Sequence, residues 1–180
     1  MTERTNRGPA AAAENRAAII KAAGEIFSEQ GLSAPLNAIA KRAGVGQGSL
    51  YRHFPTRTSL AIAAFDAGLT QIEALVASGG TLKMVLAMVT EQAMSSVAFL
   101  EILVPLVHDP KALALEGRMR AIVASTIAEG IASATVPPHF TVDDILLAIR
   151  MVAGALGSTT EDEREELVAA SWRLLGIRLS

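Results

Sequence analysis

The chain has 180 residues, enough for one large or two small domains, and its formal net charge of -2 gives no sign by itself of a nucleic-acid partner. The charges are unevenly placed, however. Residues 1–60 carry eight basic and four acidic side chains, a balance of +4, whereas residues 61–180 carry eight and fourteen, a balance of -6. A basic head joined to an acidic body is typical of a DNA-binding module carried by a domain with a different task.

The sequence lacks the residue patterns of a catalytic or metal centre. It has no cysteine, which excludes a disulfide framework, thiolate catalysis and Cys-based zinc sites. The three histidines, His53, His108 and His139, are far apart, and no HExxH motif, phosphate loop or Ser-His-Asp grouping is present. We therefore expect a protein that is not an enzyme and has no cofactor or metal.

Targeting signals are also missing. The N-terminus carries Glu3 and Glu14 and has no apolar segment of the kind found in a signal peptide. Charges or prolines interrupt every apolar stretch before the roughly 18 to 20 residues that a membrane span needs. We expect a cytoplasmic protein.

The N-terminal part is expected to contain an arm and one helix. Residues 1–12 are small and polar and are predicted to be a disordered arm, more often a solvated tail than a DNA contact. From about residue 14 to Gln30 the apolar side chains recur with the period of a helix, which Gly31 should end. The stripe consists of Ile19, Ala22, Ala23, Ile26 and Phe27.

Residues 36–55, LNAIAKRAGVGQGSLYRHFP, have the layout of a helix-turn-helix. The first segment places apolar residues at offsets of three, four and seven, and Gly44 follows where that helix must stop. A second helix opens at Gln47, with Leu50 and Phe54 facing inward. A buried helical hairpin with a solvated face is the alternative, but the spacing, the glycine and the polar residue types all favour the helix-turn-helix.

The outward face of the second helix is rich in hydrogen-bond donors and suits the major groove of DNA. We expect Gln47 to read a base, and the hydroxyl, imidazole and cationic groups to hold phosphates. For His53 and Tyr51 an internal, half-buried role is the alternative. The full set of candidate DNA-binding residues is Asn37, Lys41, Arg42, Gln47, Gly48, Ser49, Tyr51, Arg52, His53 and Arg57.

The run AGVGQGSLYRHFPTRTSL closely resembles the signature of TetR-type bacterial transcriptional regulators, commonly AGVS-x-GTLYRHFPSKEAL. The segment IIKAAGEIFSEQGLSAPLNAIA resembles the preceding part of the same family, so the resemblance covers roughly residues 16–60. The chain departs from the pattern at a few positions. Leu36 and Asn37 replace a threonine and a polar or acidic residue, Gly46 and Ser49 replace serine and threonine, and Arg57 replaces lysine.

The resemblance implies a homodimer that binds a palindromic operator in double-stranded DNA, with an unknown small-molecule effector bound in the C-terminal domain. It also implies that the helix starting near Arg57 joins head and body, and that the cation at its start touches a phosphate. Repression is the common mode in the family. A regulator controlled by a protein partner, or one with no small-molecule effector, is the alternative function.

Helical periodicity continues through the rest of the chain, which predicts an all-α fold of about nine helices. The expected domains are the arm (1–12), the helix-turn-helix domain (13–56) and a helical ligand-binding and dimerisation domain (57–180). In the last of these, helices are expected at about 57–79, 81–96, 97–107, 110–134, 142–156 and 161–177.

The last two helices are apolar over more than one stripe, which favours a face that packs inward and another that meets a second copy. A wholly monomeric core is the alternative. The resembled family pairs these two helices with their twins. The candidate interface residues are Ile145, Ala148, Ile149, Val152, Ala155, Leu156, Leu167, Ala170 and Leu174.

A ligand pocket in the body is indicated only weakly, by methionines and aromatic residues with a few polar anchors. For each of these side chains a plain core or surface role is the more common one. The candidate lining residues are Met84, Met88, Glu91, Gln92, Phe99, His108, Arg118, Met119, Met151 and Trp172.

Overall fold

The computed structural model describes residues 8–31, 33–95, 110–156 and 159–179. Over these ranges the fold is all-α, as predicted, with eight α-helices and no strand. The helix expected within residues 97–107 lies outside the described residues. The helices are α1 (Gly8–Gln30), α2 (Leu36–Arg42), α3 (Gln47–His53), α4 (Arg57–Ala77), α5 (Leu82–Ser95), α7 (Pro110–Ala132), α8 (Val142–Leu156) and α9 (Arg164–Leu174).

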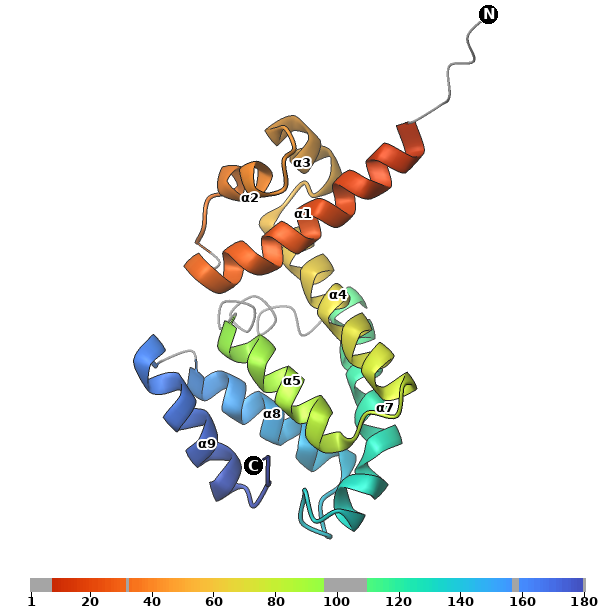
Figure 1. The fold of residues 1–180 in the computed structure, drawn as a ribbon, viewed down its shortest axis with the longest axis vertical. Helices are drawn as coiled ribbons and strands as arrows, with labels where there is room; N and C mark the ends of the chain where they lie inside the picture. The colour runs from red at the N-terminus through yellow and green to blue at the C-terminus, as the bar shows by residue number, and fades with distance from the viewer. Residues whose placement is uncertain (1–7, 32, 96–109, 157–158, 180) are drawn as a thin grey trace, which may run out of the picture.

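Helices α1, α2 and α3 form a three-helix head at one end of the molecule (Figure 1). Its core is wholly apolar: Ile19 and Phe27 of α1 pack with Ile39 of α2 and Leu50 of α3. These are the positions that the helical period assigned to the inner faces. Burial of one stripe per helix therefore explains how three short helices hold together.

Helix α1 begins at Gly8, six residues earlier than the sequence had indicated. Pro9 is compatible with the first turn of a helix, and the alanines at 10–13 have the highest helix propensity of any residue. The predicted disordered arm is therefore wrong for residues 8–12, and residues 1–7 lie outside the described part of the chain.

The turn between α2 and α3 is a glycine-terminated helix end. Gly44 has φ of +67°, the left-handed conformation that favours glycine. Val45 N–H donates to the Ala40 carbonyl at 3.0 Å and Gly44 N–H donates to the Lys41 carbonyl at 3.2 Å. This pair of bonds is the Schellman arrangement, and it turns the chain directly into α3.

Helix α4 belongs to both halves of the molecule. Thr56 caps it as predicted: the Ser59 N–H donates to the Thr56 side chain at 3.0 Å, and the Thr56 N–H donates to the Ser59 side chain at 3.3 Å. Its first turns place Leu60, Ala61 and Ala63 in the head core, and its later turns place Leu69 and Ile72 in the body core. The head core thus extends past the expected domain boundary at residue 56.

By length and mean hydropathy alone, α4 is also the one helix of the described chain that is both long enough and apolar enough to cross a membrane. Helices in the core of soluble proteins pass the same test. Its apolar side chains pack against α1, α5 and α7, so its composition follows from its position between the two cores.

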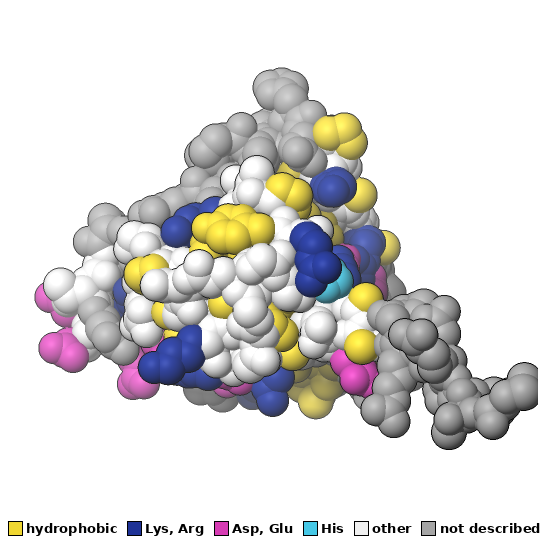
Figure 2. Space-filling model, turned by 90° about the horizontal axis from the view of Figure 1, so that it is seen from above, with side chains coloured by type: hydrophobic (Ala, Val, Ile, Leu, Met, Phe, Trp, Pro, Cys, Tyr) yellow, Lys and Arg dark blue, Asp and Glu magenta, His cyan; other side chains and the backbone are white. Residues whose placement is uncertain are grey.

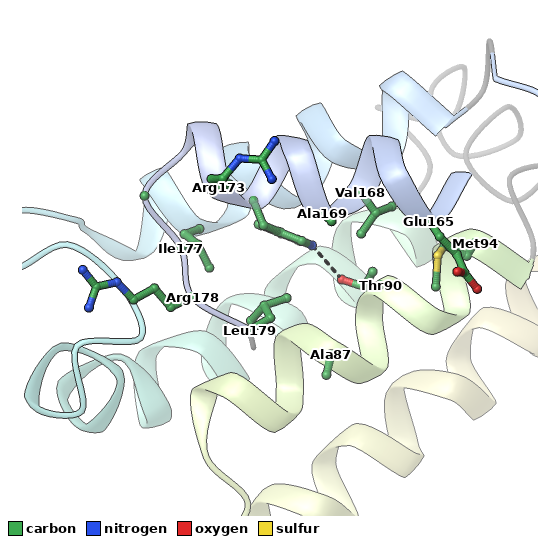
Figure 3. A pocket seen from close by; sticks show the side chains of 12 residues that line it. Ala87, Thr90, Met94, Glu165, Val168, Ala169, Arg173, Ile177, Arg178 and Leu179 are labelled. Atoms are coloured by element: carbon green, nitrogen blue, oxygen red, sulfur yellow. Dashed lines mark hydrogen bonds between the residues drawn. The ribbon is translucent and has the colours of Figure 1, made fainter. Parts of the chain in front are cut away.

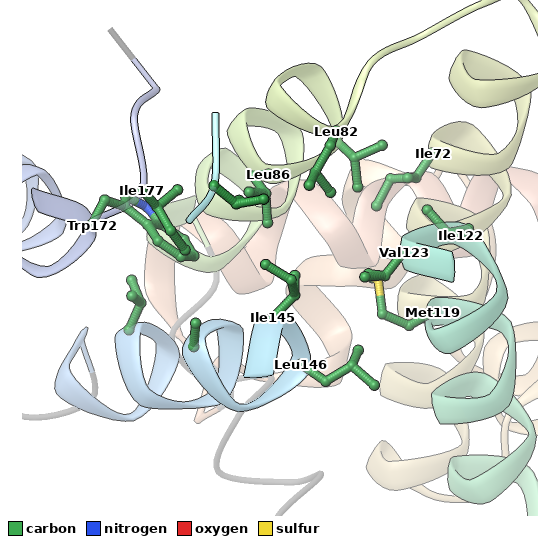
Figure 4. Packing of buried hydrophobic residues seen from close by; sticks show 14 of the residues in the cluster. Ile72, Leu82, Leu86, Met119, Ile122, Val123, Ile145, Leu146, Trp172 and Ile177 are labelled. Carbon is green, nitrogen blue, oxygen red and sulfur yellow. The ribbon is translucent and has the colours of Figure 1, made fainter. Parts of the chain in front are cut away.

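Helices α5, α7, α8 and α9 form the body around a second apolar core (Figure 4). Leu86 of α5 and Ile145 of α8 lie at its centre, Val123 of α7 approaches from one side, and Trp172 and Ile177 approach from the other. Gly130 of α7 allows close approach of α5, since a Cβ there would stand 2.3 Å from a methyl carbon of Leu82.

The predicted cap of α8 is present, and that of α9 is altered. Thr141 and Asp144 form reciprocal bonds, with the Thr141 N–H donating to the Asp144 carboxylate at 2.8 Å and the Asp144 N–H donating to the Thr141 hydroxyl at 3.3 Å. The matching Thr160 hydroxyl donates to Glu163 at 2.8 Å, but residues 161–163 form a 3-10 turn. Helix α9 is therefore shorter than the expected 161–177.

The C-terminal end of α9 repeats the glycine stop of α2. Gly176 has φ of +72°, and the Ile177 N–H donates to the Trp172 carbonyl at 2.9 Å. Ile177 lies after the end of α9 but is buried in the body core. Because it is apolar like the inner face of the helix, the sequence pattern had included it in the helix.

Candidate nucleic-acid interface

Helix α3 is anchored by its apolar side chains and turns its polar ones outward. Leu50 and Phe54 are 1% and 3% exposed and hold the helix on the head core. On the opposite side Tyr51 is 51% exposed, so its side chain is not half-buried. Of the other predicted contacts on α3, Gln47, Gly48 and Arg52 are exposed, and Ser49 and His53 are half-buried.

Basic side chains surround this end of the molecule (Figure 2). In that view lysine and arginine side chains and one histidine lie around the middle of the face, while acidic side chains lie mostly towards its margin. The Arg52 Nε donates to the Gly48 carbonyl at 3.3 Å, so the two terminal nitrogens remain donors for other acceptors. A convex surface of donors at a helix that stands out from its core has the shape and polarity to enter a major groove.

Helix α2 adds two exposed side chains to this face, Asn37 and Lys41. Lys41 forms no ion pair with any described residue, in contrast to its neighbour Arg42. Its ammonium group is therefore available to a phosphate.

Arg42 is held by carboxylates of the head itself. Its guanidinium donates to Glu25 at 3.1 Å and makes a paired contact to Glu29 at 2.9 and 2.8 Å. The side-chain hydrogen bond from Arg42 lowers the pKa of Glu29, and the same two carboxylates raise the pKa of Arg42. This geometry ties α2 to α1, and a contact between Arg42 and DNA would have to compete with these two carboxylates.

Arg57, at the start of α4, also has a partner within the head. One terminal nitrogen donates to the Ala34 carbonyl at 2.5 Å, and the side chain is half-buried. The bond links α4 to the segment that enters α2. Arg57 thus fixes the start of the joining helix, and a contact to phosphate would have to use its remaining donors.

Comparisons with known proteins agree with this geometry. Residues 19–64 match the family model described as bacterial regulatory proteins, tetR family. HTH-type transcriptional regulators of Staphylococcus aureus are 44% identical over 50 residues, and the match covers 27% of this chain and 27% of theirs. The chain thus spans about a quarter of the length of the curated relatives it matches.

Solved structures extend the likeness to the whole fold. A TetR transcriptional regulator from Streptomyces coelicolor is 24% identical, covers 89% of this chain and 97% of its own, and has a TM-score of 0.64. The TetR transcription regulatory protein from Mycobacterium vanbaalenii is 27% identical over 82% of this chain and 97% of its own, with a TM-score of 0.58. The N-terminal head of the chain matches the TetR family. Its helix-turn-helix is that of a TetR-family transcriptional regulator.

The body carries a hollow of about 690 Å³ between α5, α9 and the C-terminal segment (Figure 3). Of the predicted pocket residues that the structure describes, only Trp172 borders it. The lining residues are Ala87, Thr90, Met94, Glu165, Val168, Ala169, Trp172, Arg173, Gly176, Ile177, Arg178 and Leu179.

The other predicted pocket residues do not come together. Met84 and Met151 are 47% and 54% exposed, and Met119 is part of the body core. Gln92 lies against α4, with its amide 3.5 Å from the Gly68 carbonyl. Glu91 is exposed and Met88 is half-buried against the core, while Phe99 and His108 lie outside the described residues.

Arg118, another predicted pocket residue, instead joins α7 to α4. Its guanidinium makes a paired contact to Glu73 at 2.8 and 2.7 Å, donates to the Thr70 hydroxyl at 3.0 Å and bonds Asp66. These three partners lie along one side of α4. The hydrogen bond from Arg118 lowers the pKa of Glu73. The contacts to three residues of α4 make Arg118 a structural tie between the two helices.

The predicted dimer residues divide into two groups. Ile145, Ala148, Val152 and Leu156 are buried within the chain itself, so they support the surface without forming it. Ile149, Ala155, Leu167 and Ala170 are half-buried, and Leu174 is 86% exposed. Two exposed apolar residues that were not among the predicted interface residues, Leu147 and Met151, lie on the outer side of α8.

Proposed function

We propose that this TetR-family regulator is a ligand-responsive repressor that binds a palindromic operator as a homodimer. The observation that carries the proposal is the outward face of α3, where Gln47, Tyr51 and Arg52 are exposed on a helix fixed by Leu50 and Phe54. A regulator of this kind acts in the cytoplasm, where bacterial DNA lies.

On DNA, each subunit of the dimer presents α3 to one major groove, with the two copies about 34 to 36 Å apart to match adjacent turns. Gln47 reads a base edge, since a side-chain amide can both donate and accept there. Tyr51, Ser49, His53 and Lys41 hold phosphates and set the position of the head, while Asn37 and Arg52 add further contacts near the bases.

The homodimer is supported by the outer faces of α8 and α9. Leu147 and Met151 of α8 are exposed one turn apart, and Leu174 of α9 is the most exposed large apolar side chain among those described. Gly154 extends the α8 stripe by a position where a neighbouring helix can approach closely, because nothing lies within 4 Å of where its Cβ would be. Burying this face against its twin would remove apolar surface from water.

Ligand response requires that occupied and empty bodies favour different positions of the head. Helix α5 borders the hollow and also contacts α1 of the head and α4. Among the structural neighbours, FadR from Bacillus subtilis was solved in complex with stearoyl-CoA, with a TM-score of 0.50 and 24% identity. A ligand held in the body of this chain would oppose DNA binding through the same contacts.

The test is a gel-shift titration over a salt series, with DNA from immediately upstream of the protein's own gene and an unrelated duplex of equal length. We expect tight, saturable and selective binding with two protomers per site. Binding that is weak and equally steep in salt for both duplexes would reflect electrostatics alone and contradict the proposal.

Two substitutions separate the roles within α3. Gln47→Ala should relax discrimination at one base pair, costing about 1 to 3 kcal/mol if its contact is bidentate. Tyr51→Ala should instead weaken binding to all sequences alike. If both variants bound the operator as well as the wild type does, the assignment of α3 as the reading helix would be wrong.

A further inference from the structure

The hollow between α5 and α9 has an apolar floor whose polar atoms are already paired. The Trp172 Nε1 donates to the Thr90 hydroxyl at 3.1 Å, and that hydroxyl donates to the Leu86 carbonyl at 2.7 Å. Figure 3 shows this bond in the wall, with Val168 and Ala169 beside it on α9 and Ala87 across from it on α5. A ligand therefore meets apolar surface here, because the Trp172 N–H and the Thr90 hydroxyl already have hydrogen-bond partners.

The charged residues of the hollow stand at its rim. Arg178 lies at one end and Glu165 at the other, with Arg173 on α9 towards the Arg178 end (Figure 3). Neither arginine forms an ion pair with a described residue. One end of an apolar hollow thus carries two arginines, whose side chains extend in different directions, and the other end carries a carboxylate.

The cationic end is held in place by the backbone. The Arg178 N–H donates to the Thr135 carbonyl at 2.8 Å, which fastens the C-terminal segment to the loop after α7. Ile177 is 3% exposed and anchors the same segment in the body core. The base of the Arg178 side chain is therefore fixed relative to Trp172, so a ligand would meet a site that is already formed.

We propose that this hollow binds a small amphipathic carboxylate, with its apolar chain over Trp172 and its carboxylate towards the end that carries Arg173 and Arg178. Its volume of about 690 Å³ lies in the range of small-molecule sites, about 300 to 1,000 Å³. Guanidinium groups favour carboxylates, whereas Glu165 at the far end disfavours a second anionic group there. The inference deepens the ligand-responsive part of the proposed function by naming the ligand class.

The hollow stays open in the proposed dimer. Successive residues of a helix are about 100° apart, so Leu174 lies about 200° around α9 from Trp172. The face of α9 that borders the hollow is therefore opposite the face assigned to the twin subunit. Ligand binding and dimer formation do not compete for the same surface.

The single tryptophan of the chain reports on the site directly. The full-length protein, without DNA, is titrated with decanoate below its micelle concentration while Trp172 emission is recorded. We expect a saturable change, and contact quenching when 10-bromodecanoate is used. Decyltrimethylammonium, which has the same chain and the opposite charge, should bind about tenfold more weakly or worse.

Substitutions in the hollow test whether the fluorescence change comes from decanoate bound there. Arg173→Gln with Arg178→Gln should weaken decanoate binding about tenfold, whereas Arg120→Gln, which removes a cation from the α7 surface, should leave it unchanged. Ala87→Phe, at an exposed position of the lining, should block binding by filling the hollow. Circular dichroism of each variant confirms that it is folded.

Three results would overturn the inference: no saturable Trp172 response to decanoate, equal binding of the cationic probe, or full binding by a folded Ala87→Phe protein. Because no DNA is present, these results are separate from the gel shift. Selective operator binding without a decanoate response would leave the regulator assignment intact and reject this ligand class.

Discussion

The head and the body are each tied by one arginine that reaches two carboxylates on a neighbouring helix, but their cores differ in kind. Arg42 joins α2 to Glu25 and Glu29 of α1, and Arg118 joins α7 to Asp66 and Glu73 of α4. The described head core is wholly apolar, whereas the body buries Thr90, Thr126 and Thr135. The head therefore depends on apolar packing, while the body also depends on hydrogen bonds that must all be made.

The largest effect is expected from a cavity in the head core, which tests whether the two cores unfold independently. Phe27→Ala removes a 1% exposed ring, and a substitution of this type costs about 3 to 5 kcal/mol. We expect the variant to lose helical signal at lower temperature while the unfolding of the body, followed by Trp172 fluorescence, shifts much less. Thermal melts followed by circular dichroism and by fluorescence measure the two.

The control is Ile20→Ala, a half-buried neighbour on α1, which should change either melt only slightly. If Phe27→Ala lowered both midpoints equally, α4 would be joining head and body into one cooperative unit. Head and body would then unfold together, although their cores are separate in the structure.

The buried hydroxyl of the body offers the next largest effect. Thr90→Val keeps the shape but leaves the Trp172 indole N–H without its acceptor, which should cost about 1 to 3 kcal/mol. Thr90→Ser keeps the hydroxyl and should cost less. Urea unfolding of both variants gives the two values, and a larger loss in Thr90→Ser than in Thr90→Val would show that methyl packing, not the hydrogen bond, is what Thr90 supplies.

Arg118→Gln tests the tie between α7 and α4. The side chain is about one third exposed and its partners more so, so we expect a loss of only about 0.5 to 1 kcal/mol after screening by water. The pKa of Glu73 is lower in the folded protein than in the unfolded chain, because Arg118 stabilises its charged form. The stabilisation is therefore fully present above the unfolded pKa, about 4.3, and is lost as pH falls through the folded pKa.

Urea unfolding at neutral pH and at about pH 3 checks this sign. The difference in free energy of unfolding between wild type and Arg118→Gln should be largest at neutral pH and shrink at the lower one. A difference that grew on acidification would mean that the carboxylates do not stabilise the folded state through Arg118.

The sequence predicted the head well because there each apolar position has one possible neighbour. With three short helices and a glycine turn, the stripe containing Ile19 and Phe27 packs against Ile39, Leu50 and the first turns of α4. In the body, periodicity shows that α5 has an inner face but not which helix meets it. Thr90 and Ala87 therefore gave no signal of a hollow, and Arg178 lies beyond any helix.

For a related reason, the sequence could not show which basic side chains of the head are paired with carboxylates. The positive net charge of residues 1–60 indicated DNA binding. It could not show that Arg42 forms ion pairs with Glu25 and Glu29 of α1. A salt bridge between residues 17 positions apart needs the crossing of α1 and α2, which no local pattern contains. Lys41, the adjacent residue, has no such partner among the described residues.

This pair gives the finest test, because Lys41→Gln and Arg42→Gln remove the same charge from neighbouring positions. Neutralising a true phosphate contact lowers the slope of log K against log salt by about one, and Lys41→Gln should do so. Arg42→Gln should leave the slope nearly unchanged, since its charge is already balanced by Glu25 and Glu29. Operator titrations between low and physiological salt measure both slopes. If the Arg42 variant lost as much slope as the Lys41 variant, the guanidinium would have to leave its carboxylates when DNA binds, and the tie between α1 and α2 would be a feature of the free protein only.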